Sequence, residues 1–222
     1  MISKRLKILK NDFKDLGIDG YIVPKNDEFF SEYSQKDRLK FISNFSGSAG
    51  YAVILKNKNY LFVDGRYTIQ AQIESKKNFK IIDYQKIIDC KLFKNLILGI
   101  DPKLFTSFQI NKFFGKTNEI KVININLIDK IFKKRSISSK PFYSLDTNVV
   151  GESLKNKINK INVFLKKNKS NYMFVTAPEN VAWLLNIRGL DNPNSPIPNC
   201  HLFLDSKNNF YIVRKKEKFK RL

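Results

Sequence analysis

The sequence is poor in the two residue types that most often hold metals. His201 is its single histidine, so the chain alone cannot build a histidine-rich metal site or most histidine-based proton relays. Its two cysteines, Cys90 and Cys200, lie far apart and have no Cys or His partner at metal-ligand spacing, which argues against a zinc site and suits a reducing compartment. We therefore expect no metal ligand in this chain.

Long apolar runs are also missing. The runs "YAVIL" and "LILGI" are far shorter than the ~20 residues of a membrane span. The first residues, "MISKRLKILKND", lack the continuous apolar core of a signal peptide. Since 42% of the residues are hydrophobic and 13% aromatic, the chain has enough apolar surface for a packed core. We expect a soluble, unexported, cytoplasmic protein.

Acidic residues are scarce relative to basic ones. The chain has 20 Asp and Glu against 41 Lys and Arg, a net charge of +21. Such an excess is one mark of a nucleic-acid-binding protein, but a specific binder gathers its basic residues on one face or helix. Here the lysines are spread over nearly every segment, and a solvated terminus explains the dense run "RKKEKFKRL" at least as well as an RNA contact does. Nucleic-acid binding therefore remains the weaker alternative, with strong salt dependence as its expected signature.

Residues 1–133 alternate between helical and strand-like patterns. The first segment is an amphipathic helix that we expect to begin at a Ser3 cap and to end at Gly17. Strand-like runs then alternate with helical ones, and two of them form a hairpin around "KNKN". The strand-like runs are "DGYIVP", "YAVIL", "YLFV", "FKIIDY", "LILGID" and "IKVINI". This order predicts an α/β domain with a mixed sheet.

A change in composition separates a second unit from the first. Residues 134–149 are rich in Lys, Ser and Pro and weak in periodicity, so we expect a linker there. Residues 150–222 start again with a helix whose apolar face carries Leu154, Ile158, Ile161 and Leu165. A strand, a second helix and a hairpin follow, and the sequence stops where a domain of usual size would continue. We expect a partial, truncated second α/β domain.

Two arginines at predicted corners are the candidate ligand contacts. Arg66 follows Asp64 at a strand end, where loops of α/β sheets commonly meet ligands. Arg188 lies in the proline-rich stretch "NIRGLDNPNSPIPN". A planar guanidinium donates several hydrogen bonds at once and so suits a peptide carboxylate or carbonyl. Alternatively, each arginine pairs with its local aspartate, Asp64 or Asp191, and only holds its corner.

Two other stretches are interpreted as structural. His201, within "NCHLFLD", is expected to occupy an ordinary strand position rather than a catalytic one. The stretch "GSAG" is not followed by Lys-Ser/Thr or by a helix, so it is a tight turn of small residues rather than a phosphate-binding loop.

Several motifs together resemble a known family. They are "YIVP", "SEY", "FISNFSGSAG" and "DGRY" within residues 19–72, then "GIDP" and "APENVAWLLNIRGLDNPNSP". They resemble the N-terminal part of creatinases and Xaa-Pro aminopeptidases, and closely that of the three-domain cytosolic aminopeptidase P type. The resemblance implies a mixed-sheet creatinase N-terminal-like α/β domain, followed by the beginning of a second, similar α/β domain.

The resemblance also implies an activity. Such enzymes are metallopeptidases that remove the N-terminal residue from peptides with proline at position two, using two divalent metals, typically manganese, held by a third, C-terminal domain. No residues here match that domain, so we expect no catalytic residue in this chain and no activity from it alone. By resemblance Arg66 faces the substrate. We expect Asp64 and Tyr67 to position it, and Arg188 and Asp191 to have supporting roles. The chain would be the non-catalytic front portion of such an enzyme, or else a stand-alone non-catalytic module that binds peptides or complements a separate catalytic chain.

Overall fold

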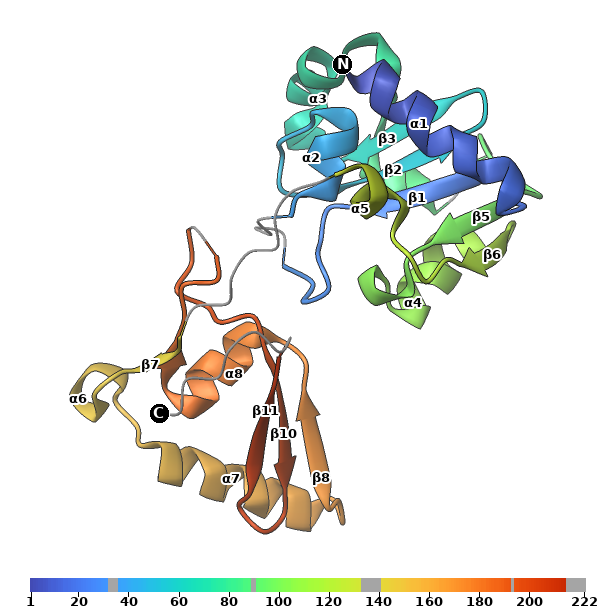
Figure 1. Cartoon of the computed structure of the whole chain (residues 1–222). Helices are drawn as coiled ribbons and strands as arrows, with labels where there is room; N and C mark the ends of the chain where they lie inside the picture. The colour runs from blue at the N-terminus through green and yellow to red at the C-terminus, as the bar shows by residue number, and fades with distance from the viewer. Residues whose placement is uncertain (32–35, 89–90, 133–140, 193, 215–222) are drawn as a thin grey trace. The chain divides into compact units, whose positions relative to one another are not determined.

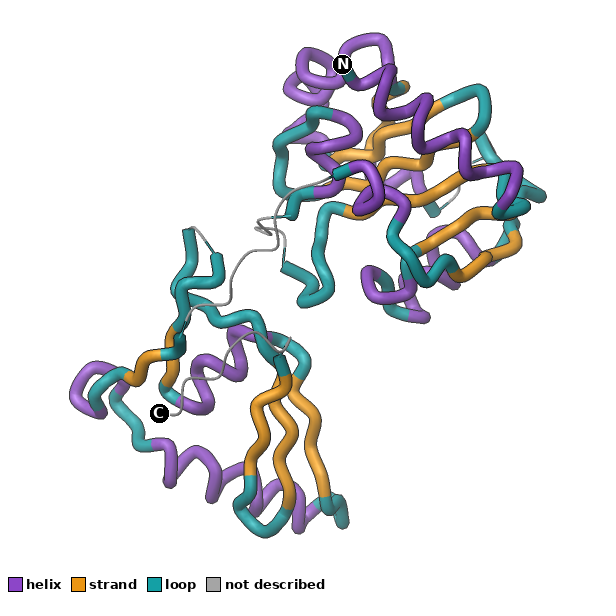
Figure 2. Tube along the Cα trace, viewed as in Figure 1, coloured by secondary structure: helices purple, strands orange, loops and turns teal. Residues whose placement is uncertain are grey.

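The computed structural model divides the chain into two units, Met1–Arg135 and Ser136–Leu222. Figure 1 shows both units, and Figure 2 shows their helices and strands. The structure describes residues 1–31, 36–88, 91–132, 141–192 and 194–214.

The first unit is built on a six-stranded mixed sheet. Its strands are β1 (Gly20–Pro24), β2 (Gly50–Leu55), β3 (Asn59–Val63), β4 (Lys80–Asp83), β5 (Ile97–Ile100) and β6 (Glu119–Val122). They lie in the order β4-β3-β2-β1-β5-β6, and β2 alone runs antiparallel to its neighbours. The other five strands therefore end at one edge of the sheet, where β2 begins. We call this the carboxyl edge.

Helices and turns cover both faces of this sheet (Figure 1). Strand side chains alternate between the faces, so Tyr21 and Val23 of β1 enter one apolar layer and Ile22 enters the other. The first layer packs under α1 (Ile2–Asp15), α2 (Arg38–Ser43), α3 (Thr68–Ser75) and α5 (Leu127–Ile131). The second packs against η3 (Tyr84–Ile87), η4 (Pro102–Leu104), α4 (Ser107–Ile110) and η5 (Asn111–Gly115). The predicted α/β fold with a mixed sheet is confirmed.

One detail of the first helix differs from its prediction. The helix ends as expected before Gly17, which has a positive φ of 56°. Its beginning was predicted wrongly, because the structure places Met1 at the N-cap and Ser3 inside the first turn. Ile2 is buried, and its burial in the apolar layer extends the helix past the predicted cap.

The second unit is smaller and has its own core. Its elements are β7 (Tyr143–Ser144), α6 (Thr147–Val150), α7 (Leu154–Lys167), β8 (Tyr172–Val175), α8 (Pro178–Leu185), β9 (Ile187–Arg188), β10 (His201–Asp205) and β11 (Phe210–Val213). Strands β11, β10 and β8 form an antiparallel sheet, and β7 pairs with β9. Ile158 and Leu165 of α7 are buried on the helix face that the sequence predicted.

The structure also bears on the predicted linker, residues 134–149. Its first part lies outside the described residues, so the predicted boundaries stay predictions. From Pro141 onward the chain is structured, since Tyr143 pairs with Arg188 and Asp146 caps the short helix α6. In the part of the chain that the structure describes, no helix has the length and apolar character needed to cross a bilayer.

Candidate functional site

The Arg66 corner is built by the carboxylate that precedes it. Strand β3 ends at Val63, and Asp64 then caps the 3₁₀ turn η1 (Gly65–Tyr67) that leads into α3. Asp64 Oδ1 accepts hydrogen bonds from the Arg66 amide at 3.0 Å and from its Nε at 2.9 Å. Both hydrogen bonds lower the pKa of Asp64, and the one from the Arg66 side chain has the larger effect. The Arg66 side chain remains 75% exposed.

Tyr67 fixes the other side of the corner. Its phenol oxygen lies 3.0 Å from Ser48 Oγ, in the small-residue turn before β2. Its ring packs edge-on against Phe45, with the ring centroids 5.8 Å apart. The guanidinium carbon of Arg66 lies 5.5 Å from the centre of the Tyr67 ring, within cation–π range. The corner thus holds the base of the arginine in place and leaves its tip exposed.

A hollow of about 350 Å³ opens beside this corner at the carboxyl edge. Its lining comes from the loop after β1, the turn before β2, the end of β3 and the residue after β4. We call it the carboxyl-edge hollow, and its principal lining residues are Lys25, Asn26, Ser48, Tyr51, Asp64 and Tyr84.

The hollow has an aromatic floor and polar walls. The rings of Tyr51 and Tyr84 stack with centroids 5.6 Å apart. Burial is the main reason that the pKa of Tyr51 is raised, and electrostatic and hydrogen-bond effects of Tyr84 raise it further. The Lys25 ammonium lies 2.5 Å from an Asp37 carboxylate oxygen. Asn26 Nδ2 donates to the backbone oxygens of Leu104 and Asp27, so what this amide can offer a ligand is its oxygen.

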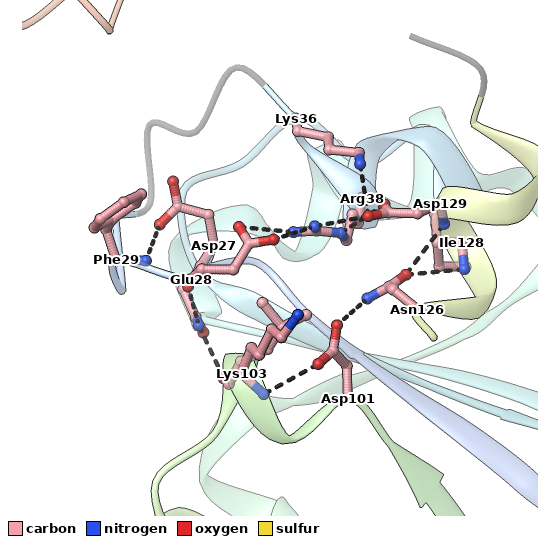
Figure 3. A network of polar contacts seen from close by, with 12 residues as sticks. Asp27, Glu28, Phe29, Lys36, Arg38, Asp101, Lys103, Asn126, Ile128 and Asp129 are labelled. Carbon is pink, nitrogen blue, oxygen red and sulfur yellow. Dashed lines mark hydrogen bonds and ion pairs between the residues drawn. The ribbon is translucent and has the colours of Figure 1, made fainter. Parts of the chain in front are cut away.

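A buried arginine organises the neighbouring part of the carboxyl edge (Figure 3). The Arg38 side chain is only 1% exposed and lies between two carboxylates. Its Nε and Nη2 donate to Asp129 at 2.8 and 3.0 Å, and Nη2 also donates to Glu28 at 2.6 Å. Burial alone would raise the pKa of Asp129, but hydrogen bonds from Arg38 and Lys36 outweigh it and the pKa is lowered.

Asn126 extends this network to the ends of β5 and β6. Its Nδ2 donates to Asp101 at 2.9 Å, and its Oδ1 accepts from the amides of Ile128 and Asp129. Asp101 also accepts from the Lys103 amide at 3.0 Å (Figure 3). The loops that follow β1, β5 and β6 are therefore joined through buried polar contacts, which gives the carboxyl edge a fixed backbone.

The two candidates in the second unit are not paired with each other. Arg188 donates to the backbone oxygens of Ala182 and Ile187 at 3.3 and 2.8 Å. In the described part of the chain, Asp191 pairs instead with Arg214, at 3.2 Å. Of the local pairs that the sequence offered as an alternative, Asp64–Arg66 forms and Asp191–Arg188 does not.

His201 and Cys200 of the second unit lie in surroundings typical of residues with a structural role. His201 begins β10, and its Nδ1 lies 2.8 Å from the Thr176 carbonyl oxygen, in keeping with the strand position expected for it. Cys200 is buried, and burial raises the pKa of its thiol to about 11, which makes it a poor nucleophile. Cys90 lies outside the described residues.

The described residues do not fit a two-metal centre. Within the described ranges, no group of three His, Cys, Asp or Glu side chains is close enough to hold a metal ion. The carboxylates of the carboxyl edge accept from Arg38, Arg66 and backbone amides instead.

Sequence reasoning missed several residues of this edge. Lys25 and Asn26 directly follow the predicted strand "DGYIVP", and Tyr84 closes the predicted strand "FKIIDY". The rule that α/β sheets bind ligands beyond the carboxyl ends of their strands could have indicated all three. Arg38 gave no such signal, because its partner Asp129 is distant in sequence.

Family comparison agrees with the architecture of both units. A family model described as the Creatinase/Prolidase N-terminal domain matches residues 5–128, and a second model with the same description matches residues 133–221. The chain belongs to the creatinase/prolidase N-terminal domain family.

Two individual relatives within this family are similar to most of this chain. Xaa-Pro aminopeptidase 1 of Dictyostelium discoideum is 35% identical over 219 residues, which cover 88% of this chain and 35% of that protein. A probable Xaa-Pro aminopeptidase P of Coprinopsis cinerea is 32% identical over 211 residues, covering 88% of this chain and 34% of the relative. The chain thus spans about a third of the length of these relatives.

A solved structure agrees in fold across the whole chain. It is the X-prolyl aminopeptidase of Caenorhabditis elegans, described as a cytosolic enzyme with a di-nuclear active site. The TM-score is 0.88 at 27% identity, covering 100% of this chain and 40% of that one. The resemblance drawn from the sequence motifs is therefore confirmed.

Proposed function

We propose that this chain is the substrate-facing, non-catalytic portion of an Xaa-Pro aminopeptidase, which removes the first residue of peptides with proline at position two. In this proposal the two metals, manganese by preference, are held by a catalytic portion outside the residues described here. The observation that carries the proposal is the Arg66 corner, where an exposed guanidinium stands on a fixed base at the carboxyl edge.

The geometry of this corner suits a peptide backbone. The guanidinium fork of Arg66 is held by the Asp64 carboxylate, through Nε at 2.9 Å and Nη2 at a longer 3.4 Å, while the side chain is 75% exposed. Such a fork can donate two hydrogen bonds to a carbonyl or carboxylate oxygen pair, whereas an ammonium acts as a point charge. Tyr67 and Ser48 reduce the movement of the corner, which lowers the entropy lost when a peptide binds.

The partners and the location follow from the same proposal. The substrates are peptides with proline at position two, and the catalytic portion is either joined to this chain or supplied by another. The cytosol is the proposed compartment, supported by the description of the Caenorhabditis elegans enzyme. Arg188 and Asp191 are proposed to support the loop after α8, through the backbone of Ala182 and through Arg214.

A chimera tests the proposal. In it, this chain replaces the matching third of the Dictyostelium discoideum relative, and hydrolysis of an Xaa-Pro peptide is measured with Mn²⁺. Arg66→Lys keeps the charge but loses the fork, so we expect kcat/KM to fall about 10- to 100-fold with an unchanged melting temperature. Arg5→Lys is the matched control, because Arg5 also lies over an aromatic ring, Phe41. It should leave kcat/KM unchanged.

Two results would contradict the proposal. Full activity of the Arg66→Lys chimera would show that the corner only closes a local ion pair. Chelator-sensitive hydrolysis by this chain alone, supplied with Mn²⁺ and free of contaminating peptidase, would show that it holds its own catalytic metals.

A further inference from the structure

We propose that the carboxyl-edge hollow is a side-chain subsite. It takes one large, neutral side chain, preferably aromatic, of a peptide whose adjoining carbonyl or carboxylate is bound by Arg66. This assignment rests on the proposed function, because that function makes a peptide the ligand.

The size of the hollow limits what can occupy it. Its volume of about 350 Å³ lies at the lower end of the range for small-molecule pockets, which suits one bulky side chain better than a cofactor. Its position at the carboxyl edge is where open α/β sheets commonly bind ligands.

The floor favours an aromatic occupant. The Tyr51 ring lies against Tyr84 and is backed by Phe105 and Phe113, with centroid distances of 5.6, 6.2 and 5.9 Å. An entering ring can extend this cluster in offset or edge-on contact, a gain beyond that of its buried area. A side chain as small as alanine makes no such ring contact.

The charges around the hollow favour a neutral occupant. The Lys25 ammonium is paired with Asp37, and the Asp64 carboxylate with Arg66. A charged side chain would lose its hydration without finding an uncompensated counter-charge. The Asn26 oxygen can accept a hydrogen bond from a phenol, and the Ser48 hydroxyl, which contacts Tyr67, keeps a second hydrogen-bonding position.

Two contacts connect the hollow to the Arg66 guanidinium. Asp64 lines the hollow and accepts from Arg66 Nε at 2.9 Å. Ser48 also lines it and contacts Tyr67, whose ring lies beneath the guanidinium. The guanidinium is thus connected to the lining of the hollow through Asp64 and Tyr67, and we expect a single residue to place its ring in the hollow and its carbonyl or carboxylate oxygens at Arg66.

The test uses this chain itself and N-acetyl-L-tyrosine, followed by ¹H–¹⁵N NMR. We expect shift changes at the amides of Asn26, Ser48 and Gly50, with a Kd on the order of 1 mM for a ligand of this size. N-acetyl-L-alanine should bind at least ~10-fold more weakly. Arg66→Lys should weaken N-acetyl-L-tyrosine several-fold and its carboxamide analogue less, since the carboxylate is the better partner of the fork.

Substitutions at Tyr84 test the floor. Tyr84→Ala should weaken N-acetyl-L-tyrosine at least ~10-fold, while Tyr84→Phe, which keeps the ring, should stay within ~3-fold and guard against a folding defect. Tyr172→Ala, the same change at an exposed site on β8, is the matched control and should have no effect.

The subsite would be overturned if about 10 mM ligand, roughly ten times the expected Kd, caused no shift changes. Equal affinity for N-acetyl-L-alanine, or undiminished binding by Tyr84→Ala, would also overturn it. Because this assay needs no catalysis, it is separable from the chimera experiment. Arg66-dependent turnover without binding in the hollow overturns the subsite alone. Binding in the hollow alongside Arg66-independent turnover upholds the hollow and overturns the proposed function.

Discussion

A single residue, Arg38, is expected to contribute strongly to the stability of the first unit. It is buried and binds two carboxylates, so replacing it by an apolar residue removes the guanidinium from Glu28 and leaves Asp129 with Lys36 alone of its two cationic partners. We expect Arg38→Met to lower the free energy of unfolding by about 3–5 kcal/mol. Urea unfolding followed by far-UV circular dichroism measures this change.

Lys130→Met is the control for that measurement. Lys130 pairs with Asp12 on the surface, where the two side chains are 43% and 38% exposed, so its loss should cost less than about 1 kcal/mol. Equal effects of the two substitutions would mean that the Arg38 network does not stabilise the unit.

The same network predicts how stability depends on pH. Burial of Glu28 and Asp129 would raise their pKa values, but Arg38 outweighs it and both are lowered. Carboxylates with lowered pKa values stabilise the fold above their unfolded pKa of about 4, and this stabilisation is lost as pH falls through the lower folded values. The urea midpoint should therefore be constant near neutral pH and should decrease below about pH 4. Asp129→Asn should reduce the steepness of this decrease, and an unchanged profile would contradict the assignment.

At the scale of elements, the hairpin of β2 and β3 is flanked by two glycines with different roles. A Cβ on Gly50 would lie 2.7 Å from the Phe62 carbonyl oxygen in the paired strand, whereas a Cβ on Gly65 would lie 3.6 Å from an Asp83 carboxylate oxygen, an ordinary contact. We expect Gly50→Ala to cost about 1–3 kcal/mol and Gly65→Ala to change stability by less than about 0.5 kcal/mol. Thermal unfolding of the two variants measures the difference, and a larger loss from Gly65→Ala would show that the glycine of the corner is needed for its shape.

Elements were predictable where their signal is local. The strands of the first unit carry alternating or continuous apolar runs, and the Asp64 corner follows directly from the end of such a run. Local signals failed at Ser3, because the burial of Ile2 moved the start of the helix. Local signals did not indicate the pair of Asp191 and Arg214, because the two residues are distant in sequence.

At the scale of the whole molecule, the two units have separate apolar cores and should unfold separately. Trp183, the single tryptophan, belongs to α8 of the second unit, so its fluorescence reports that unit. We expect Arg38→Met to shift the circular dichroism transition of the first unit and to leave the Trp183 transition unchanged. A parallel shift of both signals would show that the units unfold as one.

The family and the order of strands and helices could be predicted from the sequence, because motifs such as "FISNFSGSAG" and "DGRY" are contiguous. The carboxyl-edge hollow could not, since its lining comes from four separate segments that only the sheet brings together. The Asp64–Arg66 corner was therefore predictable as local structure, whereas Tyr51 was predicted only as part of a strand, and the role of Arg66 stays a prediction.

The reversed direction of β2 has a practical consequence. Pairing of Gly50 with Val63 sets the spacing between the turn that holds Ser48 and the corner that holds Asp64. The far end of the same hairpin, around Asn57, lies at the opposite edge of the sheet. A fluorescent label or short epitope inserted there would mark the protein without disturbing the carboxyl edge, whereas a one-residue insertion within β3 would turn its side chains over and take the corner out of register.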